Sequence, residues 1–225
     1  RRRIWLNSQQ GRFESIPADA ETLQDVLPHA DADLAELAQF LSVESESADE
    51  LNRYALAVAD RAVAQSPEVP ETWRSRAEVH RKMGVMGSAI SDLKQVVELQ
   101  PGNFRPWYEL ALLQLMVDDR QGYQHTCREM VSSIPPSGET TIEEFVSWTS
   151  ALGSAELDDW GPLMERAEYV VAMQPASMPY RKALGGIYLR AGLYGPAYEE
   201  LIEADRLLND PSTSMQSSPA YPWYL

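Results

Sequence analysis

Apolar residues recur along this chain at the three- and four-residue spacing of amphipathic helices, and prolines divide the pattern into segments of constant length. Pro67, Pro101 and Pro135 lie 34 residues apart, twice in succession. A period of this size is typical of arrays of helical hairpins, in which each hairpin buries its apolar side against its neighbours. The pattern therefore predicts an all-α chain built from stacked two-helix repeats.

The residue types within each period explain how two helices would pack. Small residues at positions 8 and 20 let the helices approach closely, large residues at positions 4, 11 and 24 fill the space around that contact, and proline at position 32 ends the second helix. Counted from Pro70 as position 1, the matching residues are Trp73, Ala89, Leu93, Val96 and Pro101. Counted from Phe104, they are Trp107, Ala111, Tyr123, Cys127, Met130 and Pro135. Counted from Met178, they are Gly185, Tyr188, Ala197, Leu201 and Ala204.

This pattern resembles the tetratricopeptide repeat (TPR). The resemblance implies a TPR-type α-solenoid, a right-handed superhelix of helical hairpins, preceded here by an irregular acidic N-terminal lead. We expect the array over residues 51–209, with repeats at about 36–69, 70–103, 104–137, 138–177 and 178–211. In the first repeat only the second helix, at about 51–65, fits well. The repeat at 138–177 has six extra residues, which we place at 154–161.

The segments outside the array differ in composition. Residues 13–50 form an acidic linker with a short helix near 32–41, and between Phe13 and Asn52 there are eleven acidic residues and no Lys or Arg. Residues 1–12 are interpreted as the remnant of a propeller blade. Residues 210–225 are expected to form a loop and the start of a truncated helix. We expect the chain to be part of a longer protein.

A closer resemblance lies in residues 105–113, 122–123 and 127–128, which look like the TPR region at the C-terminal end of multidomain proteins of planctomycete-type bacteria. Arg3-Ile4-Trp5 is similar to the end of a WD-repeat propeller blade, and residues 33–42 resemble the helix that connects propeller and repeats. The resemblance implies a bacterial, cytoplasmic protein. It also implies an upstream WD-repeat propeller, in some members preceded by a Ser/Thr kinase domain.

Charge and cysteine content exclude several classes of function. The formal net charge of −15 opposes binding to nucleic acid or to anionic membranes. No apolar run is long enough to cross a membrane, and a single cysteine cannot build a disulfide framework or a cysteine-rich zinc site.

No catalytic or metal-binding pattern stands above background. His125 and Cys127 are two residues apart, so a helix points them to different sides, and Cys127 occupies a core position. His80 stands where the repeat places tyrosine and is expected to pack in the core. Paired carboxylates such as Asp118-Asp119 are adjacent and do not face one another. We therefore expect no enzyme activity in this part of the protein, no metal and no cofactor.

The predicted function is a protein–protein interaction scaffold that binds a partner protein or peptide in the concave groove of the solenoid. Positions 5, 9 and 12 of the first helices would line that groove: Arg74, Glu78 and Arg81; Tyr108, Leu112 and Leu115; and Lys182, Gly186 and Leu189. Basic ends and an apolar middle suit a segment with an apolar anchor and acidic flanks. A clamp for the C-terminal carboxylate of a chaperone tail is excluded, because glutamate at position 9 would repel it.

Two alternatives stay open at this point. In the first, the curvature of the superhelix brings Tyr108, Leu112 and Leu115 against the next repeat, and they are packing residues. In the second alternative the chain is the C-terminal regulatory arm of a signalling protein, and an upstream Ser/Thr kinase domain carries the activity.

Overall fold

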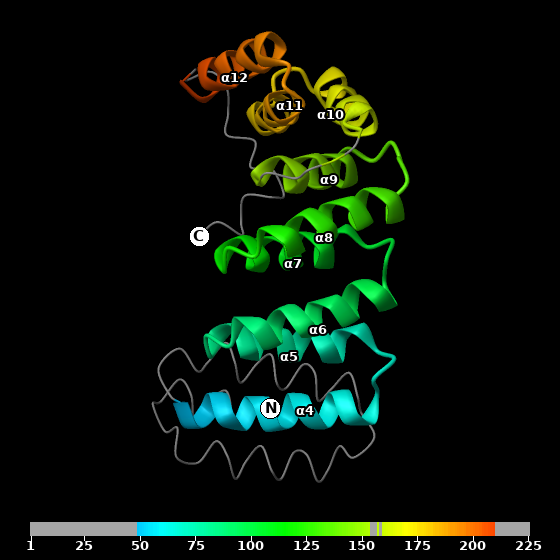
Figure 1. Ribbon diagram of the computed structural model, residues 1–225, viewed down its shortest axis with the longest axis vertical. Helices are drawn as coiled ribbons and strands as arrows, with labels where there is room; N and C mark the ends of the chain where they lie inside the picture. The colour runs from blue at the N-terminus through cyan, green and yellow to red at the C-terminus, as the bar shows by residue number, and fades with distance from the viewer. Residues whose placement is uncertain (1–48, 154–156, 158, 210–225) are drawn as a thin grey trace. The chain divides into compact units, whose positions relative to one another are not determined.

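The computed structural model describes residues 49–153, 157 and 159–209. The acidic lead, the propeller remnant and residues 210–225 lie outside these described residues. Throughout the described ranges the secondary structure is α-helical (Figure 1). The chain divides after Gln100 into an N-terminal and a C-terminal unit, which are described separately.

The described helices have the bounds that a hairpin array requires, with the two helices of a pair joined by short turns. The N-terminal unit contains α4 (Asp49–Gln65), α5 (Pro70–Lys82) and α6 (Met86–Leu99). The C-terminal unit contains α7 (Phe104–Met116), α8 (Arg120–Ser133), α9 (Thr140–Leu152), α10 (Gly161–Met173), α11 (Met178–Arg190) and α12 (Tyr194–Asn209).

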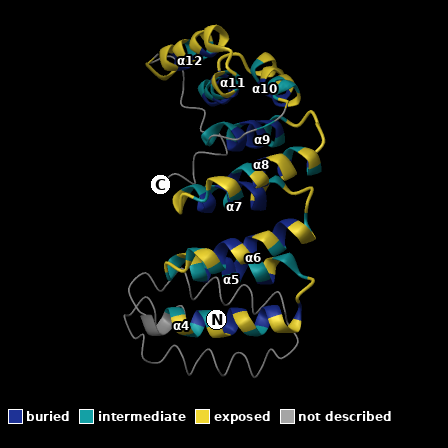
Figure 2. Ribbon diagram, in the orientation of Figure 1, coloured by how far each residue is buried: buried dark blue, intermediate teal, exposed yellow. Residues whose placement is uncertain are grey.

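Within each unit, consecutive helices pack through their apolar sides. In the N-terminal unit α5 contacts both α4 and α6. In the C-terminal unit the first helices of successive hairpins are direct neighbours, because α9 contacts both α7 and α11. Burial alternates along each helix accordingly (Figure 2). Ala89 and Ala111, at the small positions, are fully buried.

The turn that joins the two helices of a hairpin contains, at position 15, a residue in the left-handed backbone conformation. The residues are Gly84, Asp118 and Gly192, with φ of 74°, 55° and 78°. The amide after each of them donates to a carbonyl five residues earlier, which closes the end of the first helix. These bonds join Val85 to His80, Asp119 to Gln114 and Leu193 to Tyr188.

The turn between hairpins is held by the side chain at position 4. Trp73 Nε1 donates to the Pro67 carbonyl at 2.7 Å, and Trp107 Nε1 donates to the Pro101 carbonyl at 2.9 Å. In α11 the same position is Arg181, whose Nε donates to the Pro175 carbonyl at 2.7 Å. The proline carbonyl that ends one repeat is thus the acceptor for the first helix of the next.

Helix α9 reverses this arrangement. Its position-4 residue is Glu143, and Glu143 Oε1 accepts from the Ser137 amide at 2.7 Å and from the Gly138 amide at 3.3 Å. The other carboxylate oxygen of Glu143 lies 3.5 Å from Nη1 of Arg166 on α10, and both side chains are almost fully buried. Arg166 also donates to the Ile134 carbonyl. Burial lowers the pKa of Arg166, while Glu143 opposes that shift.

The extra residues of this repeat lie on both sides of α9. The connection before α9 covers residues 134–139, whereas the equivalent connections cover 100–103 and 174–177. The turn after α9 covers 153–160, whereas the other hairpin turns cover 83–85, 117–119 and 191–193. The sequence analysis placed all six residues at 154–161. Because Glu143 needs backbone N–H donors, the preceding turn is longer as well.

Substitution of two glycines in the N-terminal unit should have opposite effects. Neither Gly84 nor Gly87 has an atom within 4 Å of an added Cβ, but only Gly84 has a positive φ. We expect Gly84→Ala to lower the free energy of unfolding by about 1 kcal/mol through backbone strain. We expect Gly87→Ala in α6 to raise it by about 0.5 kcal/mol through helix propensity. Urea unfolding measures both, and a loss of similar size for the two variants would contradict this explanation.

The buried ion pair of α9 and α10 gives a second prediction. Arg166→Met removes the only cation that approaches Glu143 among the described residues. Because a buried carboxylate would then have no counter-charge, we expect a loss of about 3–5 kcal/mol of stability. The control is Arg128→Met on the exposed side of α8, which should change stability by less than about 0.5 kcal/mol. Equal losses for the two variants in urea melts would show that the pair is not important.

Candidate functional site

The nine predicted groove residues lie on α5, α7 and α11. Those on α5 belong to the N-terminal unit and the other six to the C-terminal unit. We therefore treat the two sets as separate surfaces. The larger candidate site is the face formed by the first helices α7, α9 and α11, which we call the first-helix face.

One of the two predicted groove cations on α5 is paired within the helix. Arg81 makes a two-pronged hydrogen bond to Glu78, with Nε and Nη2 each 2.7 Å from a carboxylate oxygen. The two residues are one helical turn apart, so the pair forms within α5. Arg74 is half-buried. The Arg81 guanidinium is therefore directed at Glu78.

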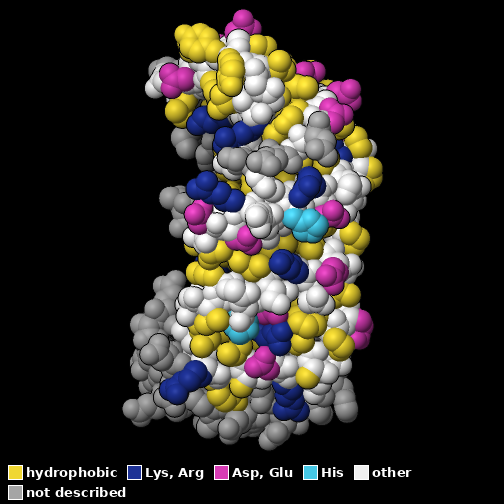
Figure 3. All heavy atoms as spheres, viewed as in Figure 1, with side chains coloured by type: hydrophobic (Ala, Val, Ile, Leu, Met, Phe, Trp, Pro, Cys, Tyr) yellow, Lys and Arg dark blue, Asp and Glu magenta, His cyan; other side chains and the backbone are white. Residues whose placement is uncertain are grey.

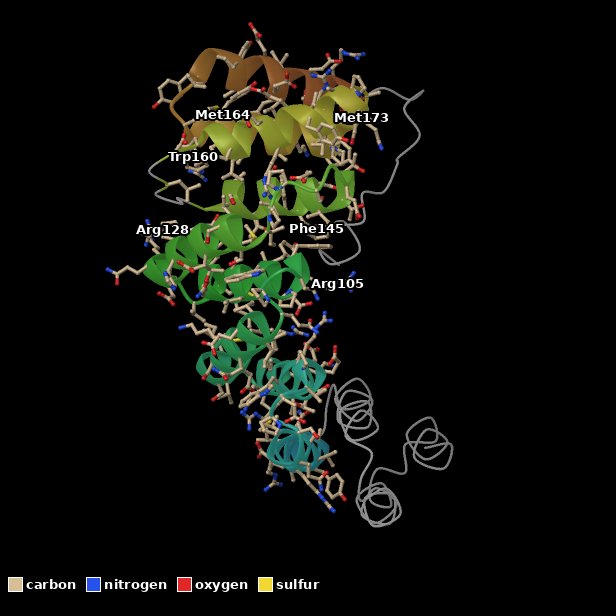
Figure 4. All side chains as sticks on the ribbon, turned by 90° about the vertical axis from the view of Figure 1, so that its right-hand side faces the viewer. Arg105, Arg128, Phe145, Trp160, Met164 and Met173 are labelled. Carbon is tan, nitrogen blue, oxygen red and sulfur yellow. The ribbon has the colours of Figure 1, made fainter. Side chains whose placement is uncertain are left out.

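Tyr108 on α7 is buried rather than open. Its side chain is 3% exposed, and its ring stands edge-on to Phe145 of α9 with 5.4 Å between ring centroids. Phe104 also packs on Phe145, with 4.7 Å between ring centroids. Figure 4 shows Phe145 on the side of α9 that is turned toward α7. The next hairpin thus covers Tyr108, and this is the packing alternative that the sequence left open.

Around this buried pair lies a rim of half-buried apolar side chains. Phe104, Leu112, Trp148 and Leu152 pack against Tyr108 and Phe145 without being fully covered. We call these six residues the α7–α9 aromatic cluster. Its accessible part therefore comes from Phe104 and Leu112 on α7 and from Trp148 and Leu152 on α9.

Leu115, the last predicted residue of α7, belongs to a second cluster. It packs with Ala111, Tyr123 and Cys127. The Tyr123 hydroxyl donates to the Thr149 carbonyl at 2.7 Å and accepts from the Gly153 amide at 2.8 Å. A Cβ on Gly153 would lie 2.6 Å from the Tyr123 ring. Tyr123 therefore fixes the C-terminal end of α9 at a position where the repeat usually has alanine.

The residues on α11 differ in exposure. Gly186 lies where α11 approaches α9 closely, because an added Cβ would be 2.9 Å from the Ala151 Cβ. Gly186 is thus a packing residue in this structure. Lys182 is half-buried and Leu189 is exposed. The accessible chemistry of α11 on this face is therefore one ammonium group and one leucine.

Helix α9 is the part of the site that the sequence analysis missed. It lies between α7 and α11 and contributes Trp148 at position 9, equivalent to Leu112 and Gly186. Phe145 and Trp148 are not among the groove residues that the sequence predicts. The six extra residues obscured the register of this repeat, although the i, i+3 spacing of two aromatics was a usable signal.

The other reactive groups are structural or exposed. Cys127 is fully buried, and burial raises the pKa of its thiol to about 12. His80 Nε2 lies 3.7 Å from Oδ2 of the buried Asp92, which Arg76 also binds. Among the described residues, no three His, Cys, Asp or Glu side chains are placed to hold a metal ion. Within the same ranges no helix is long and apolar enough to cross a membrane.

The comparisons with known proteins identify the fold. YrrB, described as a TPR protein with an unusual peptide-binding site, superposes with a TM-score of 0.58 at 14% identity over 85% of this chain and 93% of its own. MamA 41-end from Desulfovibrio magneticus RS-1 gives 0.51 at 16% identity, over 80% and 98%. A tetratricopeptide repeat protein from Parabacteroides merdae gives 0.51 at 11%, over 91% and 77%.

The fold is a TPR-type α-solenoid. The prediction of an all-α solenoid is therefore confirmed for the described part of the chain. No family model and no curated protein matches the sequence. The resemblance to planctomycete-type propeller and kinase proteins stays a prediction, as does the handedness of the superhelix.

Burial of Cys127 leads to a testable prediction. Only the thiolate reacts with Ellman's reagent, and a raised pKa together with full burial suppresses it. We expect the native protein to react at least about 100-fold more slowly than an Ala172→Cys variant, whose new thiol would be exposed on α10. Urea should abolish the difference. Rapid reaction of Cys127 in the folded protein would contradict its assignment to the core.

Proposed function

We propose that the C-terminal unit is a non-catalytic interaction module that binds a peptide segment of another protein on the first-helix face of α7, α9 and α11. The observation that carries the proposal is the α7–α9 aromatic cluster, whose rim leaves Leu112 and Trp148 partly accessible above a rigid aromatic base. Tryptophan on a well-packed support is a frequent energetic centre of protein interfaces.

The rigid base matters because binding costs conformational entropy. Phe145 contacts both Phe104 and Tyr108, and Tyr123 holds the C-terminal end of the same helix. A side chain such as Trp148 on that helix is already restricted before a partner arrives. The entropy that is lost when a peptide covers it is therefore small.

The expected ligand has an apolar anchor and an acidic flank. The apolar anchor would contact Leu112 and Trp148, and acidic residues would face Lys182 on α11. Because a half-exposed ammonium acts mainly through long-range attraction, its contribution should appear in the association rate and in the salt dependence. The groove role of Arg74, Glu78 and Arg81 stays a prediction for the N-terminal unit, with Arg81 already paired to Glu78.

The TPR fold supports this proposal, since YrrB is described as having a peptide-binding site. Catalysis by an upstream kinase domain, a cytoplasmic location and a bacterial source rest on the sequence resemblance alone. We keep the regulatory-arm interpretation as the second candidate.

Selection from a random peptide display library tests the function directly. We expect the selected peptides to share an aromatic or aliphatic anchor next to Asp or Glu. Leu112→Ser combined with Trp148→Ala should weaken their binding at least about tenfold, or about 1.4 kcal/mol. The control is Met116→Ser, which removes an exposed apolar side chain outside the cluster.

The role of Lys182 is tested with the same peptides. Lys182→Glu should slow association more at low than at high salt, whereas Arg128→Glu on the second helix α8 should not. Circular dichroism confirms that each variant is folded. Peptides that bind the Leu112/Trp148 variant as well as the parent would exclude the first-helix face as their site.

A further inference from the structure

The last described helix exposes an apolar surface that is interrupted by Asp205. Tyr194, Tyr198, Leu201, Ile202 and Leu208 lie on one side of α12, and we call them the α12 outer face. Tyr194 is 71% and Tyr198 66% exposed. Figure 3 shows hydrophobic side chains gathered over α12 at the top of the view. Scattered apolar residues are ordinary on a protein surface, but a row of this length on one helix side is not.

Comparison with the other repeats shows that no described helix covers this face as the next hairpin covers α8 and α10. Position 24 is occupied by Ala59, Leu93, Cys127, Ala167 and Leu201 in successive repeats. The first four residues are at most 3% exposed, whereas Leu201 is 38% exposed. In the C-terminal unit α8 and α10 are each contacted by the following first helix, α9 and α11. Among the described helices none follows α12.

The face is also unlike a normal solenoid end. Terminal repeats need a polar outer side to stay soluble, because nothing stacks on them. The inner side of α12, with Ala197, Ala204 and Leu207, is already buried against the unit. Leu201 packs against α11 with part of its side chain, because a Cβ added to Gly185 would lie 2.7 Å from the Leu201 Cγ. The rest of the Leu201 side chain is exposed. The remaining apolar side chains of α12 therefore require a separate partner.

The charge of α12 disfavours a second copy of the chain as that partner. The helix contains Glu199, Glu200, Glu203 and Asp205 against a single basic residue, Arg206. Arg206 is already paired with Glu203. Asp205 is exposed one turn beyond Leu201, so a symmetric dimer through this face would bring acidic side chains together.

The chain itself contains a segment with suitable chemistry. Residues 211–225 follow α12 after a single residue, Asp210, and contain no Asp, Glu, Lys, Arg or His. Their apolar members are Met215, Tyr221, Trp223, Tyr224 and Leu225, and prolines at 211, 219 and 222 favour extended backbone. An uncharged segment avoids the repulsion that an acidic copy would meet.

The segment is also long enough. Helix α12 has 16 residues and therefore spans about 24 Å. An extended chain advances about 3.3 Å per residue, so eight residues suffice to run back along the helix. We propose that residues 211–225 fold back over the α12 outer face and cover the end of the solenoid. The surface so covered is distinct from the first-helix face.

Disulfide trapping in the full chain tests this proposal. The test variant combines Tyr198→Cys, on the outer face, with Ala220→Cys in the segment. The matched control combines Glu199→Cys, which points about 100° away from Tyr198 around α12, with Ala220→Cys. Both target positions on α12 are exposed, so folding should be retained, and native Cys127 is buried in each variant.

We expect an intramolecular disulfide in the test variant at a yield at least about tenfold above that of the control. Non-reducing gels and peptide mass spectrometry measure it. Adding Leu201→Glu to the test variant should reduce the yield, whereas adding Met116→Glu should not.

Three results would overturn the proposal. Equal yields in test and control variants would show only random encounters. A disulfide between two molecules would assign the face to a second copy. Absence of any disulfide would show that residues 211–225 do not cover the face, and a further repeat or another protein would then be its partner.

Discussion

The hydrogen bond between position 4 and the preceding turn is the constraint on which the rest of this structure depends. This bond ties the first helix of a hairpin to the turn that precedes it. Trp73, Trp107 and Arg181 make it by donating to a proline carbonyl. The indole and the guanidinium differ in shape but supply the same N–H donor, so the turn geometry survives the substitution.

The exception explains the irregular repeat. Glu143 can only accept, so the turn before α9 must present N–H groups in place of a carbonyl. A buried carboxylate also needs a cation, and Arg166 on α10 supplies it. The longer connection, the acidic position-4 residue and the buried arginine are therefore parts of one local solution.

The same helix is the centre of the first-helix face. Two side chains hold its C-terminal end. The Tyr123 hydroxyl donates to the Thr149 carbonyl, and Arg190 donates to the Ala151 carbonyl at 3.3 Å. Helix α9 is thus fixed at its start, by Glu143, and at its end. The irregular helix is as firmly placed as the regular ones, and this allows its aromatic residues to present a preorganised surface.

The sequence by itself determined the helical period, the hairpin register and the small and large positions, because each depends on contacts within one repeat or on local turn chemistry. The fully buried Ala89 and Ala111, and Gly185 packed closely against Leu201, follow from that register. The charge balance is also evident from the sequence alone, as is the lack of a catalytic motif in that sequence.

Only the tertiary structure decided which first-helix residues stay accessible. Tyr108, Leu112 and Gly186 occupy equivalent or neighbouring register positions, yet Tyr108 is covered by Phe145 and Gly186 by Ala151, while Leu112 stays half-open. Contacts between successive hairpins of the C-terminal unit set this difference. A 34-residue pattern describes each repeat alone, so it does not specify which of its side chains the next repeat covers.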